Sequence, residues 1–289
     1  MCVCVDIAII GGGAAGLSAG INVVARGKTV RIFSNKTNYL ARAERVDNYL
    51  GFYQINGTEL MNFFRQHAKQ MGIEVEIGKV VNIIPFNKQF MINFNGNIIV
   101  AKAVILALGV TKAKTISGEE TFIGKGVSYC ATCDGMLYRQ KDVIVYGHAD
   151  DIVEEANFLV DIGVNVTFIS ASARPTELKQ NISFVHGNIQ EIIGQDLVEA
   201  VKVKENLIKT NGVFILRNAL APSALIEGLE IVNGFIKVDR KMNTNIAGIF
   251  ACGDCVGTPL QVAKAVGEGL IAAQEAAKYI EKSGGEEIK

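Results

Sequence analysis

The sequence predicts an α/β protein with two Rossmann-like nucleotide-binding domains, because a strand–turn–helix–strand pattern occurs twice. The first pattern has an apolar run at 5–10, then glycines, an Ala-rich helical pattern at 14–26 and a second apolar run at 29–33. The second pattern begins with an apolar strand at 142–146. Each pattern is the start of a βαβ unit, which is the building block of a parallel sheet.

The remaining elements follow from periodicity and turn residues. After the first unit we expect a helix capped by Thr58, two strands and a hairpin turn at Asn95-Gly96, with these elements at 58–71, 74–81 and 103–107. The second unit continues with a helix at 151–162 and a strand at 165–170. A long Ala-rich helical pattern over 263–282 closes the chain.

Composition limits the classes of partner. The 289 residues are 49% apolar, and 29 Lys and Arg balance 29 Asp and Glu, so net charge predicts no nucleic-acid partner. The apolar start lacks a basic region and contains Asp6, so no export signal is expected. The longest apolar run, 98–110, is broken by Lys102, so no membrane span is expected either. The default compartment is the cytoplasm.

The six cysteines stand at 2, 4, 130, 133, 252 and 255, a spacing that does not suggest a disulfide scaffold. A four-thiolate zinc site would need Cys133 and Cys252 separated by roughly 15–20 residues, far fewer than the chain places between them. No metal site is therefore predicted. Cys252 and Cys255 flank Gly253-Asp254, where burial explains small residues, and whether they form a second redox pair is left open.

Gly11-x-Gly13-x-x-Gly16 follows a strand and opens a helix, which is the context of a dinucleotide fingerprint. Gly11 makes the turn, Gly13 lets the backbone approach a pyrophosphate, and Gly16 permits close packing. The alternative is a glycine-rich turn without a ligand. The acidic residue expected on the ribose is missing, since the second strand ends at Phe33-Ser34, and Ser34 is expected to bind the ribose hydroxyl instead.

Cys130 and Cys133 have the spacing of a redox dithiol. Two cysteines separated by two residues can close a small ring, and a thiolate at a helix start is stabilised by the helix dipole. The alternative is a pair of buried thiols without chemistry. For Asp134, which follows directly, a helix-capping role competes with acid–base catalysis and does not exclude it.

Four motifs in this order resemble the low-molecular-weight thioredoxin reductases: Gly11 to Gly16, Ala107-Leu108-Gly109, Cys130-Ala131-Thr132-Cys133-Asp134-Gly135 and Gly248 to Asp254. The resemblance implies a homodimeric, FAD-containing enzyme whose two domains are of the three-layer ββα type. It implies a discontinuous FAD-binding domain of residues 1–113 and 221–289. Residues 114–220 would form a central domain that carries the dithiol on a degenerate pyridine-nucleotide fold.

The resemblance also implies roles for single residues. Cys130 would be the more accessible nucleophile that attacks thioredoxin, Cys133 the thiol next to the flavin, and Asp134 the acid–base partner. Asp254 would bind the ribityl chain, Asn48 and 261–263 would approach the isoalloxazine, and Val81 would meet adenine. The full set expected to contact FAD is Gly11, Gly13, Ala14, Ala15, Gly16, Phe33, Ser34, Leu40, Arg45, Asn48, Val81, Ala107, Gly109, Gly253, Asp254, Gln261, Val262 and Ala263.

The chain departs from the family where NADPH normally binds. The second glycine motif is replaced by Gly147-His148-Ala149-Asp150-Asp151-Ile152, which puts a methyl group and two negative charges where a diphosphate should sit. After the next strand, 170–173 is Ser-Ala-Ser-Ala, and Arg174 is the basic residue nearby. The pattern resembles the ferredoxin-dependent flavin thioredoxin reductases.

That resemblance implies reduced ferredoxin, or flavodoxin in its place, as the electron donor and thioredoxin as the acceptor. Ferredoxin near −400 mV and thioredoxin near −270 mV differ by about 130 mV, which makes a two-electron transfer roughly 6 kcal/mol downhill. Two alternatives stay open. One is an NADH- or NADPH-dependent reductase with a divergent nucleotide site, and the other is a flavin and dithiol redox sensor without turnover.

Overall fold

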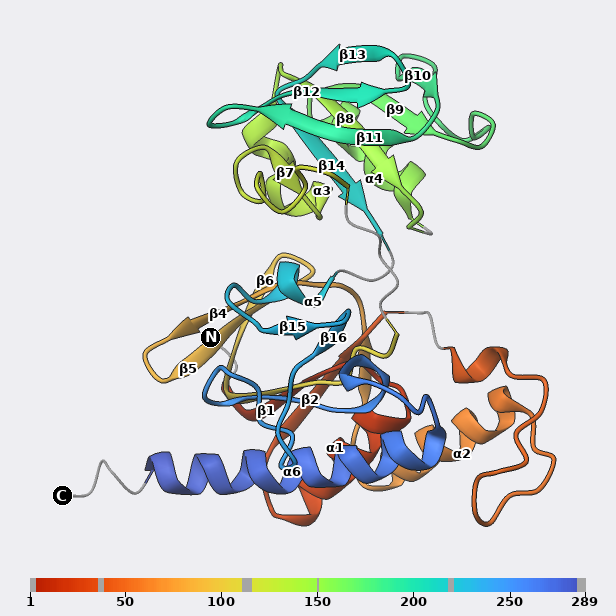
Figure 1. Cartoon of the computed structure of the whole chain (residues 1–289), viewed down its shortest axis with the longest axis vertical. Helices are drawn as coiled ribbons and strands as arrows, with labels where there is room; N and C mark the ends of the chain where they lie inside the picture. Colours follow the sequence, from red (N-terminus) through yellow and green to blue (C-terminus); the bar gives the residue numbers. More distant parts are fainter. Residues whose placement is uncertain (1–3, 36–38, 111–115, 150, 218–220, 285–289) are drawn as a thin grey trace. The chain divides into compact units, whose positions relative to one another are not determined.

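Parallel sheets covered by helices form the frame of the computed structural model (Figure 1), which describes residues 4–35, 39–110, 116–149, 151–217 and 221–284. The chain divides into two compact units. The first combines Met1–Thr111 with Leu225–Lys289, and the second is Lys112–Ala224. The boundaries thus fall at residues 111 and 224, against the expected 113 and 220. A short helix, α5 (Pro222–Leu225), spans the second boundary.

The first unit is built on a seven-stranded sheet in the order β3-β2-β1-β6-β5-β4, with β17 paired to the end of β6. Strands β1, β2, β3, β6 and β17 run parallel, whereas β4, β5 and β6 form an antiparallel meander. Its strands are β1 (Cys4–Ile10), β2 (Val30–Ser34), β3 (Val75–Ile77), β4 (Val80–Phe86), β5 (Gln89–Phe94), β6 (Asn97–Leu106) and β17 (Ile249–Ala251), with a separate hairpin of β15 (Ile231–Val232) and β16 (Phe235–Ile236).

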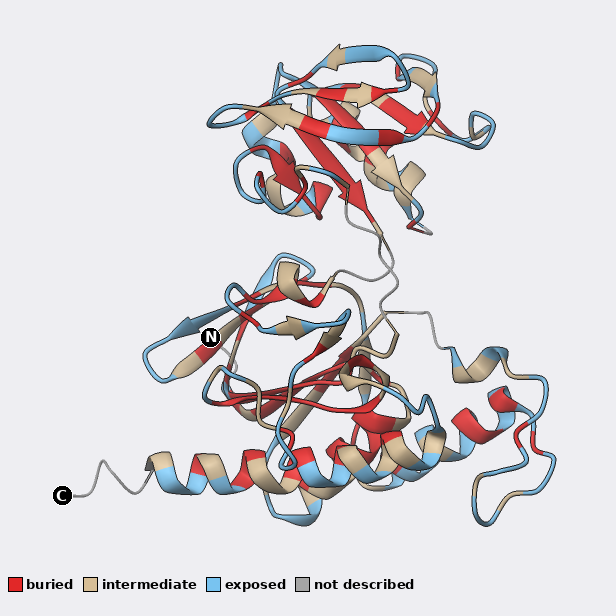
Figure 2. Ribbon diagram, viewed as in Figure 1, coloured by how far each residue is buried: buried red, intermediate tan, exposed pale blue. Residues whose placement is uncertain are grey.

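Helices α1 and α6 pack on each other and on this sheet. Gly269 permits the close approach, because a Cβ there would lie 2.3 Å from the carbonyl oxygen of Ala15. The core between them is apolar and buried (Figure 2), and it includes Ile7, Ile105 and Phe250. The helical segments of this unit are α1 (Ala14–Ala25), η1 (Leu40–Arg42), α2 (Gly57–Gln70), η3 (Gly253–Val256) and α6 (Val262–Gly284).

Two local predictions for this unit were wrong. The cap of α2 is Asn56, not Thr58, because the Asn56 side chain accepts the backbone N–H of Thr58 at 2.8 Å. The Thr58 hydroxyl donates instead to the carbonyl of Ala41. The strand expected at 74–81 is two strands. At Gly78 the pairing of β3 with β2 ends, and the chain turns into the antiparallel meander that begins with β4. A Cβ at Gly78 would collide with Phe94 and Asn95.

The second unit places α3 and α4 beside a five-stranded parallel sheet, with a three-stranded antiparallel sheet as a further layer (Figure 1). The parallel strands run in the order β10-β9-β8-β14-β7. They are β7 (Val127–Ser128), β8 (Asp142–Gly147), β9 (Asn165–Ser170), β10 (Ser183–His186) and β14 (Gly212–Leu216). The other elements are α3 (Ala131–Asp134), η2 (Gly135–Tyr138), α4 (Ile152–Asp161), β11 (Ile189–Gly194), β12 (Val198–Val203) and β13 (Asn206–Lys209).

The α/β prediction is confirmed, because both units contain parallel sheets of the Rossmann type. The hairpin at Asn95-Gly96 is also confirmed: both residues have positive φ, 49° and 81°, which is the conformation of a tight hairpin turn. Among the described residues, no helix has the length and apolar character needed to cross a membrane.

Candidate active site

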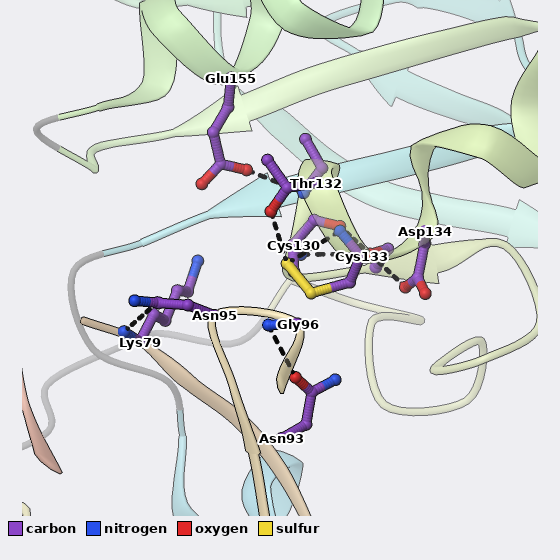
Figure 3. Close-up of a disulfide and its surroundings, with 11 residues drawn as sticks. Lys79, Asn93, Asn95, Gly96, Cys130, Thr132, Cys133, Asp134 and Glu155 are labelled. Atoms are coloured by element: carbon purple, nitrogen blue, oxygen red, sulfur yellow. Dashed lines mark hydrogen bonds between the residues drawn. A yellow bond between two sulfur atoms is a disulfide. The ribbon is translucent and has the colours of Figure 1, made fainter. Parts of the chain in front are cut away.

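The dithiol lies where β7 ends and α3 begins. Cys130 has extended backbone geometry and caps α3, and its Sγ accepts the N–H of Cys133 at 3.2 Å. The two sulfurs form a disulfide, with the Cα atoms 5.3 Å apart (Figure 3). The strand end and the single helical turn thus bring both sulfurs together, as the spacing predicted.

Asp134 is linked to the dithiol through Ser128. The Ser128 hydroxyl donates to the Asp134 carboxylate at 2.7 Å and accepts the N–H of Cys130 at 3.2 Å. Ser128 is buried, at 5% exposure, whereas Asp134 is partly exposed. Asp134 is therefore held one hydrogen-bonded side chain away from the first cysteine. Sequence reasoning missed Ser128, although its place two residues before the motif was a usable signal.

The two cysteines of the disulfide differ in exposure. In the disulfide form Cys130 is buried, at 4% exposure, whereas Cys133 is partly exposed. The Thr132 hydroxyl lies 3.4 Å from the Cys130 sulfur. Within the second unit Cys130 is thus the less exposed residue of the disulfide, and its role as the thiol that attacks thioredoxin stays a prediction.

A carboxylate on α4 also reaches the dithiol turn. Glu155 accepts the N–H of Ala131 at 2.8 Å (Figure 3). The approach depends on Gly135, because a Cβ there would lie 2.7 Å from Leu159 and 2.9 Å from Ile162 of the α4 segment. Glu155 stands 24 residues from Ala131, so no short motif pointed to it.

A buried ion pair lies behind the dithiol strand. Glu119 is completely buried and binds Arg217 in a bidentate pair, at 2.5 and 2.9 Å. It also accepts the N–H of Ile116 and the hydroxyl of Tyr129, which directly precedes Cys130. Burial and the Glu119 charge raise the pKa of Tyr129, so its hydroxyl stays protonated. Glu119 thus ties the entry segment of the second unit, its exit strand and the dithiol strand together.

Replacing Arg217 by methionine is expected to destabilise the protein by about 3–5 kcal/mol, since it leaves the Glu119 carboxylate buried without its cation. Denaturation followed by circular dichroism measures the change. The double variant E119L/R217M removes both charges and should recover most of the loss. Equal stability of R217M and the parent protein would contradict this account of the pair.

The first glycine turn is shaped for close backbone approach. Gly11 has φ +119°, and a Cβ there would lie 2.0 Å from the carbonyl oxygen of Ala107. A Cβ at Gly16 would lie 1.8 Å from the carbonyl oxygen of Gly11. Among the described residues no side chain caps the 12-residue helix α1 at Gly13, so its first amides can donate to an anion. These features fit a bound pyrophosphate.

Asp254, at the start of η3, carries a buried oxygen that needs a donor. Among the described residues its Oδ1 has no hydrogen-bond partner. Burial raises the pKa of this carboxyl, an effect that the positive charge of Lys264 opposes. An orphaned buried carboxylate oxygen costs free energy until a ligand hydroxyl reaches it. The ribityl hydroxyls of FAD are donors of the required kind, so the residues present fit the cofactor.

The residue before Asp254 is clamped on both sides. The N–H of Gly253 donates to Glu268 at 2.9 Å, and its carbonyl accepts from Lys264 at 3.0 Å. Lys264 and Glu268 form an i,i+4 ion pair on α6 and are both largely buried. Sequence reasoning missed this pair, because its partner is 11 to 15 residues away along the chain.

The other residues expected at the flavin fall into two groups. Asn48 and Gln261 meet, with the Asn48 amide donating to Gln261 at 2.6 Å. Val262 opens α6, next to the exposed Ala263. Phe33, by contrast, has its ring in the core against Phe94, and its carbonyl accepts the N–H of Gly11, so only its backbone faces the turn.

The remaining members of the expected set have these positions. Arg45 is exposed and pairs with Asp47, and the hydroxyl of Ser34 donates to the Asn35 carbonyl. Ala14 and Ala15 open α1, and Leu40 begins η1. Val81 is the second residue of β4, and Ala107 and Gly109 follow the end of β6.

Cys252 and Cys255 are buried free thiols. The Cys255 sulfur donates to the carbonyl oxygens of Cys252 and Leu106. Burial raises the pKa of both thiols, that of Cys255 to about 11. Because the thiolate is the reactive form, these residues act as packing groups in the state described here.

The second glycine turn has its backbone donors occupied. The N–H groups of His148 and Ala149 both donate to the carbonyl of Leu216, at 2.9 and 3.1 Å. Gly147 has φ +143°, and a Cβ there would lie 1.9 Å from the carbonyl oxygen of Leu216. Asp150 lies outside the described residues. The first turn of α4 carries Glu154 and Glu155, which oppose a bound diphosphate.

Arg174, the basic residue expected nearest to a 2′-phosphate, is also occupied. Its guanidinium donates to the backbone carbonyls of Ile182 and Lys179. The Ser170 hydroxyl accepts the N–H of Ser172. The second unit therefore keeps the nucleotide-binding architecture, while its turn directs several of its donors inward.

Comparison with known proteins agrees with this geometry. Residues 5–269 match the family model for pyridine nucleotide-disulphide oxidoreductases. The thioredoxin reductase of Bacillus subtilis is 32% identical, over 96% of this chain and 95% of that protein. The crystal structure of a ferredoxin-flavin thioredoxin reductase from Clostridium acetobutylicum is 40% identical, with a TM-score of 0.85 over 96% of this chain and 98% of that one.

A thioredoxin reductase from Gloeobacter violaceus is 27% identical, with a TM-score of 0.77 over 97% of this chain and 95% of that chain. The likeness thus extends over nearly the whole chain in both sequence and structure. The glycine turn, the orphaned Asp254 oxygen and the Cys130–Cys133 disulfide explain it chemically. The chain therefore belongs to the pyridine nucleotide-disulphide oxidoreductases and, within them, to the thioredoxin reductases, which are FAD-binding disulfide oxidoreductases.

Proposed function

We propose that this enzyme takes electrons from reduced ferredoxin and delivers them through FAD to the Cys130–Cys133 disulfide and on to thioredoxin. The choice of donor rests on the second glycine turn, where the His148 and Ala149 amides donate to the carbonyl oxygen of Leu216. A diphosphate would have to break those bonds beside two glutamates. The similarity to a ferredoxin-flavin thioredoxin reductase supports the same donor.

Unit by unit, we propose that the first unit is the FAD-binding domain and the second is the dithiol domain. Asp254 would accept ribityl hydroxyls, and the α1 amides after Gly13 would bind the pyrophosphate. FAD, when bound, supplies the two-electron store that matches one-electron donors to a disulfide. The remaining predicted contacts of the first unit, among them Asn48 and Gln261, belong to this proposal.

The dithiol reduces thioredoxin in three steps. Two electrons and two protons reduce the Cys130–Cys133 disulfide to two thiols. The Cys130 thiolate attacks a sulfur of oxidised thioredoxin, forming a mixed disulfide and releasing one thioredoxin thiolate. The Cys133 thiolate then attacks Cys130, which restores the enzyme disulfide and releases the second thioredoxin thiolate. Asp134, held by Ser128, is placed to supply a proton to a leaving thiolate.

The net reaction oxidises two ferredoxins and reduces one thioredoxin disulfide.

We also propose that the enzyme is a homodimer, which light scattering of the purified protein would test directly. A cytoplasmic location is part of the same proposal, because a dithiol that donates electrons works in a reducing compartment.

Anaerobic bleaching of the visible flavin band tests the donor. In the presence of oxidised thioredoxin, chemically reduced ferredoxin is expected to bleach the flavin rapidly and to sustain turnover. NADPH and NADH, supplied at concentrations that deliver as many electrons, are expected to act at least about 100-fold more slowly, since the His148 and Ala149 amides are already bonded to Leu216. Saturable, fast reduction by either nicotinamide would overturn the donor assignment and favour the NAD(P)H-dependent alternative. Flavin reduction without any thioredoxin turnover would instead favour a redox sensor.

A further inference from the structure

Glu155 reaches the dithiol from a different secondary-structure element. It stands in the first turn of α4, and its Oε2 accepts the N–H of Ala131 at 2.8 Å (Figure 3). Ala131 follows Cys130 and is completely buried. A lost partner would therefore leave a buried N–H group unsatisfied. The carboxylate thus holds the peptide that joins the first cysteine to α3.

The charge of Glu155 adds to that of Asp134 on the other side of the turn. The Asp134 carboxylate is held by Ser128. Among the described residues of the second unit, the titratable groups at the dithiol turn and its neighbours are Asp134 on α3, Glu155 on the packed α4, and Tyr138 on η2, whose pKa is raised by burial and by the Asp134 charge. Two carboxylates and a protonated phenol thus lie at the dithiol turn and beside its neighbours.

Negative charge near a cysteine disfavours its thiolate. A dithiol whose thiolate is strongly stabilised is a weak reductant, because its reduced form is stabilised relative to the disulfide. Neighbouring carboxylates act in the opposite direction and make the dithiol a stronger electron donor. An enzyme that must pass electrons onward to another disulfide needs this bias.

We propose that Glu155 is a positioning residue that holds the Cys130–Ala131 peptide and, through its charge, keeps the reduced dithiol strongly reducing. The inference rests on the proposed function only in that this dithiol is the group that reduces thioredoxin. The carboxyl oxygen accepts the Ala131 N–H, whereas the negative charge disfavours the cysteine thiolate and so makes the dithiol more reducing. Substitutions can separate the two.

Three variants of the FAD-loaded enzyme separate them. Glu155→Gln keeps an acceptor oxygen for the Ala131 N–H and removes the charge, whereas Glu155→Leu removes both. Glu154→Gln removes a neighbouring charge on the same helical turn, where the side chain is exposed, and serves as the matched control. Each protein is equilibrated in glutathione redox buffers, and the Cys130–Cys133 peptide is quantified by alkylation and mass spectrometry.

We expect Glu155→Gln to shift the dithiol–disulfide equilibrium about tenfold toward the reduced form, which is a midpoint about 30 mV less negative. The pH at which Cys130 becomes alkylatable should fall in the same variant, and Glu154→Gln should match the parent protein. Glu155→Leu should show the same redox shift together with a lower melting temperature. An unchanged midpoint in Glu155→Gln would overturn the redox role, as would an equal shift in Glu154→Gln. These readouts use neither ferredoxin nor thioredoxin, so they stand apart from the test of the proposed function.

Discussion

Cys133→Ser is expected to trap thioredoxin as a stable mixed disulfide on Cys130, and Cys130→Ser is expected to trap none. Both variants should lose at least about 10³-fold in turnover, because the two thiols act as a unit and neither can complete the exchange alone. The reason for the asymmetry is positional: Cys130 caps α3 and its sulfur receives the Cys133 N–H, which stabilises negative charge there.

The measurement is non-reducing electrophoresis of each reduced variant mixed with oxidised thioredoxin, whose disulfide the enzyme thiolate opens, followed by alkylation that caps the released thioredoxin thiol. Cys255→Ser is the matched control, because this buried thiol donates to the backbone carbonyls of Leu106 and Cys252 and should leave turnover unchanged. Since Cys130 is buried in the disulfide form, the experiment also decides which enzyme sulfur attacks thioredoxin. A mixed disulfide that forms on Cys133 in Cys130→Ser would reverse the assigned roles.

Asp254→Ala is expected to act in opposite directions on the apoprotein and the FAD-loaded protein. FAD affinity should fall roughly 100-fold, because about 3 kcal/mol of charge-assisted hydrogen bonding to the ribityl chain is lost. The apoprotein should become more stable by about 1–2 kcal/mol, since the orphaned buried Oδ1 is removed. Fluorescence titration of apoprotein with FAD and thermal melts of both forms measure the two effects.

The pH dependence of this site has a definite sign. Because burial raises the pKa of Asp254 above its ordinary 3.8, the folded apoprotein binds this proton more tightly than the unfolded chain. The resulting loss of stability is absent below pH 3.8 and grows as the pH rises through the raised value. Asp254→Ala should remove that part of the pH profile, and Glu227→Ala, at an exposed site of the same unit, should not. Identical profiles for Asp254→Ala and the parent apoprotein would contradict the assignment.

Much of the fold was predictable, because its signals are local. Apolar runs and glycine turns marked β1, α1, β8 and β9 almost to the residue. Where the prediction failed, tertiary contacts decided. Gly78 splits one expected strand because the backbone there must pass Phe94, and Asn56 replaces Thr58 as a cap because the Thr58 hydroxyl already has a partner in Ala41.

The candidate site divides in the same way. Cys130, Cys133 and Asp134 could be named in advance because their chemistry depends on spacing within one turn. Ser128 stands two residues before the motif and could have been considered, but Glu155 could not be named, since a hydrogen bond to a distant backbone amide leaves no periodic trace. For Phe33 the tertiary structure adds what the sequence left open: its ring packs in the core against Phe94, and its backbone carbonyl faces the turn.

The sequence by itself determined the α/β class, the dinucleotide turn at Gly11 to Gly16 and the redox dithiol, because each depends on residues only a few positions apart. Tertiary structure alone decided what surrounds them. The Glu119–Arg217 pair joins residues 98 positions apart, and Glu155 reaches Ala131 across 24. Such contacts arise from packing of whole elements, where burial makes each charge costly unless a distant partner meets it. Chemistry was thus encoded locally, and the electrostatic surroundings that adjust it were set by the fold.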